Sequence, residues 1–398
     1  MNKEYESLYK FTEEQAVIST HSHHLKNSDF ENFSLKSVFS CCYLTWLYQC
    51  DYDSYDSRKK MMEDMGTNTY FIWLAKSLGK LYNNGEPLNA DNWDKIDGKL
   101  KEAYNADPKR HLNILTDICK YESIIIDKYE APGSDNGVKG LFRPAFRCDS
   151  FLCAYIEGVT DENKTNPYEY SDRKPKNLTE YIEMMEKTIA AKKKSGCCAL
   201  KIAIAYERGL DFKKCSLEEA EEAFGNKNAT EKQKKRFADY VMYELCRISA
   251  KHKMPLQIHT GMGIIKKSNA INLRNLIADN PLTTFVIFHC SYPWMDDALA
   301  LGATFRNVIL DMCWLPSLST SAAIRFLAEA LEAVDAARIT WGCDTWNSEE
   351  SFGALLAMRH TLASVLSEKV TADDISMDYA QFVAQNILYS NAKRIYGL

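Results

Sequence analysis

The sequence lacks the features that define several large classes of protein. Only 17 of its 398 residues are glycine and 10 are proline, while 46% are apolar, which excludes disordered and collagen-like chains. The net charge of −5 gives no basic surface of the kind that a nucleic acid requires, so we expect no nucleic-acid partner. No run of about eighteen apolar residues occurs, and we therefore expect no membrane-spanning segment.

A disulfide framework and a cysteine zinc motif are missing as well. The 13 cysteines are odd in number, include the adjacent pairs Cys41–Cys42 and Cys197–Cys198, and show no CxxC spacing. These features argue against disulfide-stapled, zinc-ribbon and thioredoxin-like proteins. The polar N-terminal segment does not resemble a secretory signal. We therefore expect a cytoplasmic protein whose thiols mostly pack as small hydrophobic groups.

Short apolar runs alternate with long helical patterns, which is typical of repeated βα units. Helices are expected from Asn177, a suitable N-cap, to Gly196, from about 230 to 251, and in the tail from about 372. Pro144 counts against a regular central strand in its segment. The pattern as a whole predicts an α/β fold of the (β/α)8 TIM-barrel type. The eight expected strands are residues 16–20, 123–127, 141–147, 197–205, 256–259, 285–289, 308–311 and 339–344.

Residues 33–120 show helical periodicity only and no good strand. We predict one barrel domain over residues 1–398, with a helical subdomain inserted at 33–120 after the first strand. The insertion is rich in aromatic residues. These could form a hydrophobic core of its own, or a lid or subunit interface, since apolar helices often bury themselves against a partner. A homo-oligomer is therefore a hypothesis.

Four of the eight histidines lie at the ends of expected strands, and Asp344 ends the last one. That end of a barrel carries the active site. His21 and His23 are two residues apart on an extended segment, so both project from one face and could share a metal. A lone His259 or His289 would more often be a hydrogen-bonded core residue. Together with Asp344, however, the four histidines favour a catalytic metal site.

This set of residues resembles the amidohydrolase superfamily and, within it, the branch called amidohydrolase 2. The resemblance covers the barrel and leaves out 33–120. It implies a metal-dependent enzyme in which His21, His23 and Asp344 bind the metal, often with His259, while His289 binds metal or acts as a catalyst. The implied cofactor is one or two Zn²⁺ ions, with Mn²⁺ or another divalent metal as the alternative. The matching segments are Thr20–His23, Gln257–Gly261, Ile287–Cys290, Gly342–Asp344 and the C-terminal Asn386–Leu398.

Lys201 is the unusual residue of the fourth expected strand, because a lysine in an apolar strand is costly unless it is paired or neutralised. Residues 199–210 resemble a segment of poorly characterised members of this branch, some of which are fused to glutamine-synthetase-like domains. In many binuclear members of the superfamily this lysine is carbamylated and bridges two metals. The alternative is an unmodified lysine that faces the barrel mouth and pairs with Glu207 or with substrate.

Several residues near strand ends could bind substrate. Tyr206 and Arg208 are candidates for an anionic substrate, as are Arg143, Arg147 and Arg306, because guanidinium binds carboxylate in a bidentate manner. Their alternative is an ordinary surface or salt-bridge role. Three tryptophans that follow strand ends could wall a pocket, although packing roles are as reasonable. These are Trp294, Trp314 and Trp346.

The leading prediction is a metal-dependent hydrolase that cleaves a C–N or C–O bond, as in an amide or lactone, of a small anionic molecule. The metal would activate a water, and Asp344 would act as general base. The alternative is a non-oxidative decarboxylase or a uronate-isomerase-like enzyme on the same metal site, because the fold does not fix the reaction. A non-catalytic barrel is a third hypothesis; it predicts a missing ligand, and none is missing.

Overall fold

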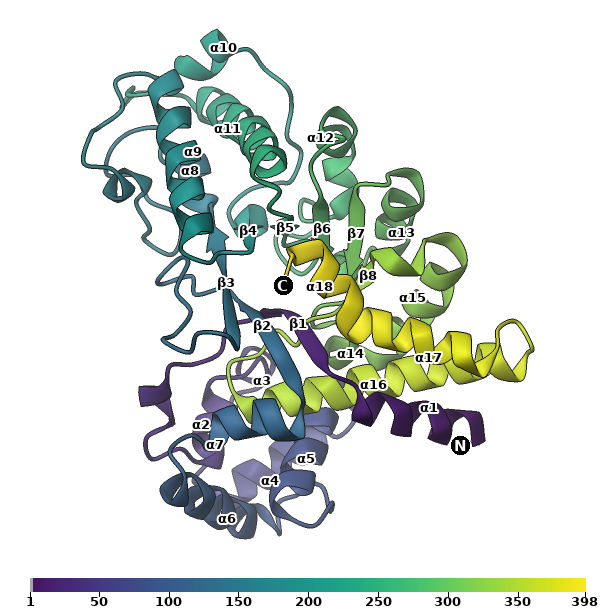
Figure 1. The fold of residues 1–398 in the computed structure, drawn as a ribbon. Coiled ribbons are helices and arrows are strands. Elements are labelled where there is room, and N and C mark those ends of the chain that lie inside the picture. Colours follow the sequence, from purple (N-terminus) through teal and green to yellow (C-terminus); the bar gives the residue numbers. More distant parts are fainter. Residues whose placement is uncertain (1–2) are drawn as a thin grey trace.

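The computed structural model describes residues 3–398, and its centre is a barrel of parallel strands (Figure 1). Neighbouring strands pair in chain order from first to last. The segment after the last strand bonds back to the first, since Thr20 N–H donates to the Trp341 carbonyl (3.1 Å). The predicted (β/α)8 barrel is confirmed. Its strands are β1 (Val17–Ser22), β2 (Tyr121–Ile126), β3 (Phe142–Arg147), β4 (Ala199–Ile202), β5 (Leu256–Ile258), β6 (Phe285–Phe288), β7 (Val308–Asp311) and β8 (Ile339–Thr340).

Helices surround the barrel and connect its strands. The expected cap is present, since the Asn177 side chain accepts from Glu180 N–H at the start of α9 (Leu178–Lys194). Thr230 also caps a helix, accepting from Gln233 N–H at the start of α11 (Glu231–His252). The helices are α1 (Lys3–Glu14), α2 (Leu35–Ser40), α3 (Leu44–Leu47), α4 (Tyr55–Asp64), α5 (Thr69–Tyr82), α6 (Trp93–Ala106), α7 (Arg110–Asn113), α8 (Asp149–Cys153), α9 (Leu178–Lys194), α10 (Leu217–Glu221), α11 (Glu231–His252), α12 (Arg274–Asp279), α13 (Met295–Thr304), α14 (Leu315–Leu318), α15 (Thr320–Ala333), α16 (Ser348–Thr371), α17 (Met377–Gln385) and α18 (Asn391–Tyr396).

Two strands are much shorter than expected, and one expected irregularity does not occur. β4 ends at Ile202 because residues 204–206 form a 3₁₀ turn, and β8 ends at Thr340, four residues before Asp344. Asp344 has φ of +55°, which an extended strand cannot contain. β3 runs through Pro144, whose carbonyl still accepts the Cys198 N–H at 3.0 Å, so the proline does not interrupt the strand.

The barrel interior is closed at its N-terminal end by α18, whose ribbon lies over the centre of the barrel in Figure 1. Ala392 and Tyr396 of this helix pack against interior residues of the strands, among them Ile18 and Val286. The Tyr396 hydroxyl accepts a hydrogen bond from the Gln257 side chain of β5 at 3.0 Å. The opposite end, where strand C-termini meet, is therefore the open end.

Helices α2 to α7 lie between β1 and β2, at the lower part of Figure 1. Their apolar side chains form a second hydrophobic cluster, separate from the main barrel core, that includes Phe39, Leu78 and Trp93. Trp314, which follows β7, belongs to the same cluster and joins it to the barrel mouth. Residues 33–120 therefore lie against the end of the barrel that carries the expected site.

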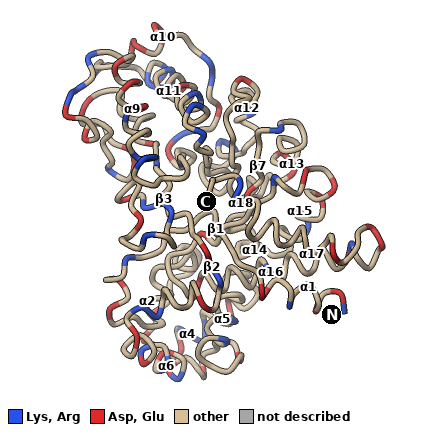
Figure 2. The backbone as a smooth tube through the Cα atoms, in the orientation of Figure 1, with Lys and Arg blue, Asp and Glu red and all other residues tan. Residues whose placement is uncertain are grey.

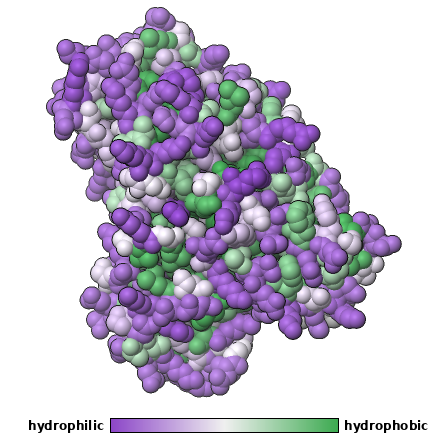
Figure 3. Space-filling view, viewed as in Figure 1, coloured by the Kyte–Doolittle hydropathy of each residue, from purple (hydrophilic) through white to green (hydrophobic). Residues whose placement is uncertain are grey.

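Charged and hydrophilic residues occupy most of the visible surface (Figures 2 and 3). Figure 2 shows basic and acidic residues interspersed around the periphery, without a large area of one sign. Figure 3 shows hydrophilic residues over most of this face, with smaller apolar areas between them. Across residues 3–398 none of the helices combines the length and the apolar character needed to span a bilayer.

Candidate metal centre

Asp344 lies beside the two histidines of β1 because the chain after β8 runs along that strand. Asp344 N–H donates to the His21 carbonyl (3.0 Å), and His23 N–H donates to the Thr345 carbonyl (3.0 Å). Gly342 permits this close approach, since a Cβ there would lie 2.6 Å from the backbone nitrogen of His21. The hydrogen bonds between the first strand and the last segment thus bring the first and last ligand candidates together.

Three ligand atoms converge at this point, and all three side chains are buried. The Oδ1 atom of Asp344 lies 3.5 Å from His21 Nε2 and 3.4 Å from His23 Nε2. Ligands on a tetrahedral zinc ion, at about 2.0–2.2 Å from the metal, lie roughly 3.3–3.5 Å from one another. The spacing of the three donors therefore fits a single divalent cation between them.

The hydrogen bonds of the rings fix which nitrogen is free to bind. His23 Nδ1 lies 2.9 Å from the Asp127 carbonyl, and His289 Nδ1 lies 2.9 Å from the Cys313 carbonyl. A carbonyl can only accept, so each Nδ1 carries the proton and each Nε2 of the neutral ring has a lone pair. In His23 that lone pair faces the Asp344 carboxylate. Two electron pairs in contact repel each other unless a cation lies between them.

The other histidines also have nitrogens available. His259 Nδ1 lies 3.0 Å from His289 Nε2 and donates to it, which leaves His259 Nε2 with the lone pair. That atom and His21 Nδ1 are buried without a hydrogen-bond partner among residues 3–398. Burial, with the nearby Lys201 and His289 adding to it, lowers the pKa of His21 and of His259 well below the ordinary value. Neutral imidazole is the form that binds a metal. Because the pKa values of these two histidines are low, protons compete only weakly with a metal ion for their lone pairs.

Three of the residues that face this centre have strained backbones. His289, Trp314 and Asp344 have φ values of +60°, +63° and +55°. Residues other than glycine rarely adopt this left-handed backbone conformation. Those that do are found preferentially at functional sites. They lie at the ends of β6, β7 and β8, so the strain is concentrated where the side chains turn toward the barrel axis.

Lys201 is buried in β4, with Nζ 3.8 Å from the centre of the Phe288 ring. Burial lowers the pKa of Lys201 to about 8, while the charges of Asp127 and Asp344 act in the opposite direction. No carboxylate of residues 3–398 lies within 4.0 Å of it. Of the two partners suggested for an unmodified lysine, Glu207 is engaged elsewhere, because its carboxylate accepts from Glu162 N–H and from the Cys153 thiol.

The sequence did not predict the buried ion pair between Arg147 and Asp127, which lies beside the histidines. The Arg147 guanidinium donates to Asp127 from both Nη2 (2.7 Å) and Nε (3.3 Å), and its Nη1 lies 3.8 Å from Asp149. Although burial opposes ionisation, Arg147 keeps the pKa of Asp127 below its ordinary value. Asp127 directly follows β2, so attention to all polar strand ends would have found it. Arg147 is thus engaged by protein carboxylates.

Tyr43 was not singled out as a site residue; it is one of the aromatic residues of the insertion that could form a lid. It comes from the chain between α2 and α3, and its buried hydroxyl donates to Asp344 Oδ1 at 3.0 Å. Burial and the Asp344 charge raise the pKa of Tyr43 well above the ordinary value, so the phenol keeps its proton. Cys313 also approaches Asp344 and His289. Burial raises its pKa as well, which favours the thiol over the metal-binding thiolate.

Aromatic rings surround the histidines. Trp346 stacks on His23 with ring centres 5.3 Å apart, Trp314 lies edge-on to His289 at 5.6 Å, and Tyr206 lies 4.5 Å from His259. Tyr43 stacks on Trp314 at 4.2 Å. The indole nitrogen of Trp314 is buried and has no partner among residues 3–398, so it offers a hydrogen-bond donor at the site.

The remaining predicted substrate residues lie elsewhere. Arg208 pairs with Asp239 at 2.7 Å in a neighbouring cavity, and Trp294 is half-buried at the start of α13. Arg306 is exposed just before β7 begins, and Arg143 is exposed near the start of β3. Both therefore lie at the N-terminal end of the barrel. For Arg143 and Arg306 this position favours the alternative of an ordinary surface role over substrate binding.

Comparison with known proteins agrees with this geometry. Residues 216–398, which carry His259, His289 and Asp344, match the amidohydrolase family model. The match covers somewhat less than half of the chain, and over these residues the chain is similar to the amidohydrolase family. A segment of 150 residues is 36% identical to the protein fluG of Emericella nidulans. The match covers 36% of this chain but only 17% of that much longer protein.

Solved structures share the fold over almost the whole chain. A uronate isomerase from Thermotoga maritima is 15% identical with a TM-score of 0.79, covering 100% of this chain and 98% of its own. A glucuronate isomerase from Caulobacter crescentus is 16% identical with a TM-score of 0.76, covering 99% and 94%. A Lactobacillus casei protein, for which metal-dependent hydrolysis has been suggested, is 17% identical with a TM-score of 0.71, covering 98% and 97%. At these identities the likeness concerns the fold alone.

Proposed function

We propose that this protein is a metal-dependent hydrolase that cleaves a C–N or C–O bond of a small anionic molecule. The observation that carries the proposal is the lone pair of His23 Nε2 facing the Asp344 carboxylate at 3.4 Å, an arrangement that calls for a cation. His21, His23 and Asp344 would hold it, with His259 as the further ligand.

A bound divalent cation would lower the pKa of a water and polarise a substrate oxygen. Asp344 accepts the proton of the attacking water through its carboxylate and returns it to the leaving nitrogen or oxygen. Tyr43 holds the Oδ1 atom of Asp344 in place through its hydrogen bond. The His289 ring, whose Nδ1 donates to the Cys313 carbonyl and whose Nε2 accepts from His259, holds the His259 ring in place, while Trp314 and Trp346 exclude bulk water.

For the metal content we propose a single zinc ion per chain, with Lys201 unmodified. His21, His23 and Asp344 form the compact cluster, whereas His259 and His289 are hydrogen-bonded to each other. Lys201, whose pKa is lowered to about 8, would serve as a proton donor to the substrate at neutral pH. Two metal equivalents, together with a ¹³C NMR carbamate signal after growth in labelled bicarbonate, would show the binuclear form.

Elemental analysis and turnover test the proposal together. Purified protein should contain zinc or manganese, and His23→Gln and Asp344→Asn should lose metal and activity, whereas His252→Gln should keep both. His252 is a suitable control because it lies at the end of α11, away from the barrel mouth. Absence of metal from the wild type, with no effect of chelators on stability, would refute the metal site.

A panel of amides, lactones and uronates in H₂¹⁸O then separates the reactions. A hydrolase places one ¹⁸O atom in its acid product. Conversion of a uronate to a ketose of the same mass, or release of CO₂ from a carboxylate, would instead establish the isomerase or decarboxylase alternative on the same residues.

A further inference from the structure

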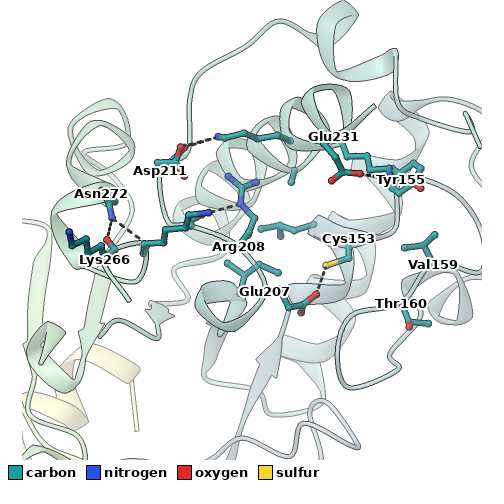
Figure 4. Close-up of a pocket in the computed structure, with 17 residues that line it drawn as sticks. Cys153, Tyr155, Val159, Thr160, Glu207, Arg208, Asp211, Glu231, Lys266 and Asn272 are labelled. Atoms are coloured by element: carbon teal, nitrogen blue, oxygen red, sulfur yellow. Dashed lines mark hydrogen bonds and ion pairs between the residues drawn. The ribbon is translucent and has the colours of Figure 1, made fainter. Parts of the chain in front are cut away.

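A second cavity, of about 810 Å³, lies beside the end of β4, between α8, α11 and the loop that follows β5 (Figure 4). Its lining includes none of the histidines of the metal centre, nor Asp344. It does include more basic than acidic residues. The basic ones are Arg208, Lys234, Lys235, Lys266 and Lys267, and the acidic ones are Glu207, Asp211 and Glu231.

Some of the basic side chains around this cavity pair with carboxylates, and others do not. Lys234 pairs with Glu231 at 2.8 Å, and Lys235 pairs with Asp239 at 2.9 Å. Lys266 and Lys267, on the opposite wall, have no carboxylate within 4.0 Å anywhere in residues 3–398. The loop after β5 therefore presents two uncompensated ammonium groups.

Arg208 adds a rigid donor to the same cavity, and Figure 4 shows it near the middle of the lining. Its Nη2 donates to Asp239 (2.7 Å), its Nε donates to the Gly209 carbonyl (3.1 Å), and the guanidinium lies 4.5 Å from the Phe212 ring centre. Its Nη1 is buried and has no hydrogen-bond partner among the described residues. These three contacts hold the guanidinium in one position beside the cavity.

Part of the remaining wall is apolar, beside the polar Thr160 and Asn272. Leu152, Val159, Ile204 and Ala238 line it together with the Tyr155 ring. A site with such a wall and a cationic end selects a ligand that has an apolar body and one anionic group. The geometry points to a binding site for an organic anion, a carboxylate or a phosphate ester attached to a hydrophobic group, separate from the metal centre.

A ligand bound in this cavity would affect the metal centre through the short turn that contains residues 204–208. Ile204, Glu207 and Arg208 line the cavity, while Tyr206 of the same segment packs on the His259 ring at 4.5 Å. Binding would therefore steady the turn that carries Tyr206.

Isothermal titration of the full chain with phenyl phosphate and with benzoate tests the site. Because binding rather than turnover is measured, and because His23→Gln protein is titrated alongside the wild type, the outcome does not depend on the proposed reaction. We expect saturable binding of at least one probe by both proteins. Comparison of the two probes identifies which anionic group is preferred.

The Lys266→Gln/Lys267→Gln pair should weaken that binding by about tenfold or more, which corresponds to about 1.4 kcal/mol. The matched pair Lys95→Gln/Lys99→Gln removes the same charge from exposed positions of α6 and should leave affinity unchanged. Thr160→Trp, at an exposed position of the cavity wall, should block the site without a change of charge.

Three results would overturn the proposal. These are absence of saturable binding of either probe, equal affinity in the Lys266→Gln/Lys267→Gln and wild-type proteins, and inorganic phosphate binding as tightly as phenyl phosphate. Circular dichroism of each variant verifies that the fold is intact.

Discussion

Asp344 is the residue on which contacts from different parts of the chain converge. It faces His21 and His23 of the first strand, and it receives the Tyr43 hydroxyl from the segment between α2 and α3. Its own backbone is left-handed. The position of one carboxylate is therefore set by three separate parts of the structure, and loss of any one of them should alter its chemistry.

Replacement of Tyr43 by Phe tests the smallest of these contacts. A hydrogen bond to a charged group contributes about 1.5–3 kcal/mol, so kcat should fall roughly ten- to hundredfold while metal content is unchanged. Steady-state kinetics and elemental analysis measure the two effects. Tyr55→Phe is the control, since its hydroxyl donates to the exposed Asp91 at 2.7 Å. Wild-type kcat in Tyr43→Phe would remove Tyr43 from the mechanism.

The Asp127–Arg147 pair should behave as a buried ion pair. Arg147→Met leaves the Asp127 carboxylate buried without its partner, and should lower the free energy of unfolding by about 3–5 kcal/mol in urea titrations. The double variant Asp127→Leu/Arg147→Met should recover much of that loss. Lys174→Gln removes an exposed pair with Glu157 and should cost about 1 kcal/mol or less. A double variant as unstable as the single one would contradict this account.

Sequence patterns predict site residues more reliably when those residues end a strand than when they reach the site from outside the barrel. His259 and His289 could be placed because β5 and β6 are recognisable apolar runs. Tyr43 lies in a helical segment rich in aromatic residues, so its sequence does not distinguish it from its neighbours. Its contact with Asp344 depends on how α2 to α7 pack on the barrel. Arg208 and Trp294 follow strands as the rule requires, yet loop geometry directs them away from the histidines.

At the scale of elements, the join between β1 and the segment after β8 is the sensitive point. Gly342→Ala would place a methyl group 2.6 Å from the His21 nitrogen and 2.7 Å from Thr20 Oγ1. The two segments must separate, so we expect a loss of about 1–3 kcal/mol in stability and weaker metal binding. Gly98→Ala, in α6 with no atom within 4 Å, should instead stabilise by about 0.5–1 kcal/mol. Thermal melts and metal titrations compare the two. Unaltered metal affinity in Gly342→Ala would show that the join tolerates the methyl group.

The same scale shows which parts of the fold a sequence can specify. Apolar runs locate most of the strands, and the Asn177 cap locates the start of α9, because these features depend on local sequence. The end of β8 could not be anticipated, because the chain leaves the extended conformation to bond with β1, more than 300 residues earlier in the sequence. Likewise Pro144 breaks the usual rule for central strands, since the carbonyl contact to Cys198 survives without its N–H.

For the whole molecule, buried carboxyls should make stability depend on pH. Burial raises the pKa of Asp149 from its ordinary value of 3.8 to about 7, against the opposing effect of Arg147. Between these values the unfolded chain releases a proton that the folded protein retains. Stability is therefore fully present below about pH 4 and is lost as the pH rises to 7, by roughly 2–4 kcal/mol.

Urea midpoints at pH 5 and 7.5 measure this contribution. Asp149→Asn should flatten the decline, since the amide does not titrate, whereas Asp172→Asn, an exposed position, should follow the wild type. An equally steep decline in Asp149→Asn would assign the effect to other carboxyls, of which Asp311, with its pKa raised to about 6 by burial, is the next to examine.

The placement of α18 over the N-terminal end of the barrel has a practical consequence. Leu398 ends the chain beside that helix, and the histidines occupy the other end of the strands. A protein immobilised through a C-terminal linker would therefore direct the mouth of the barrel into solution, where a small substrate can reach it. Such an orientation makes single-molecule and electrode-based assays practicable without redesign of the chain.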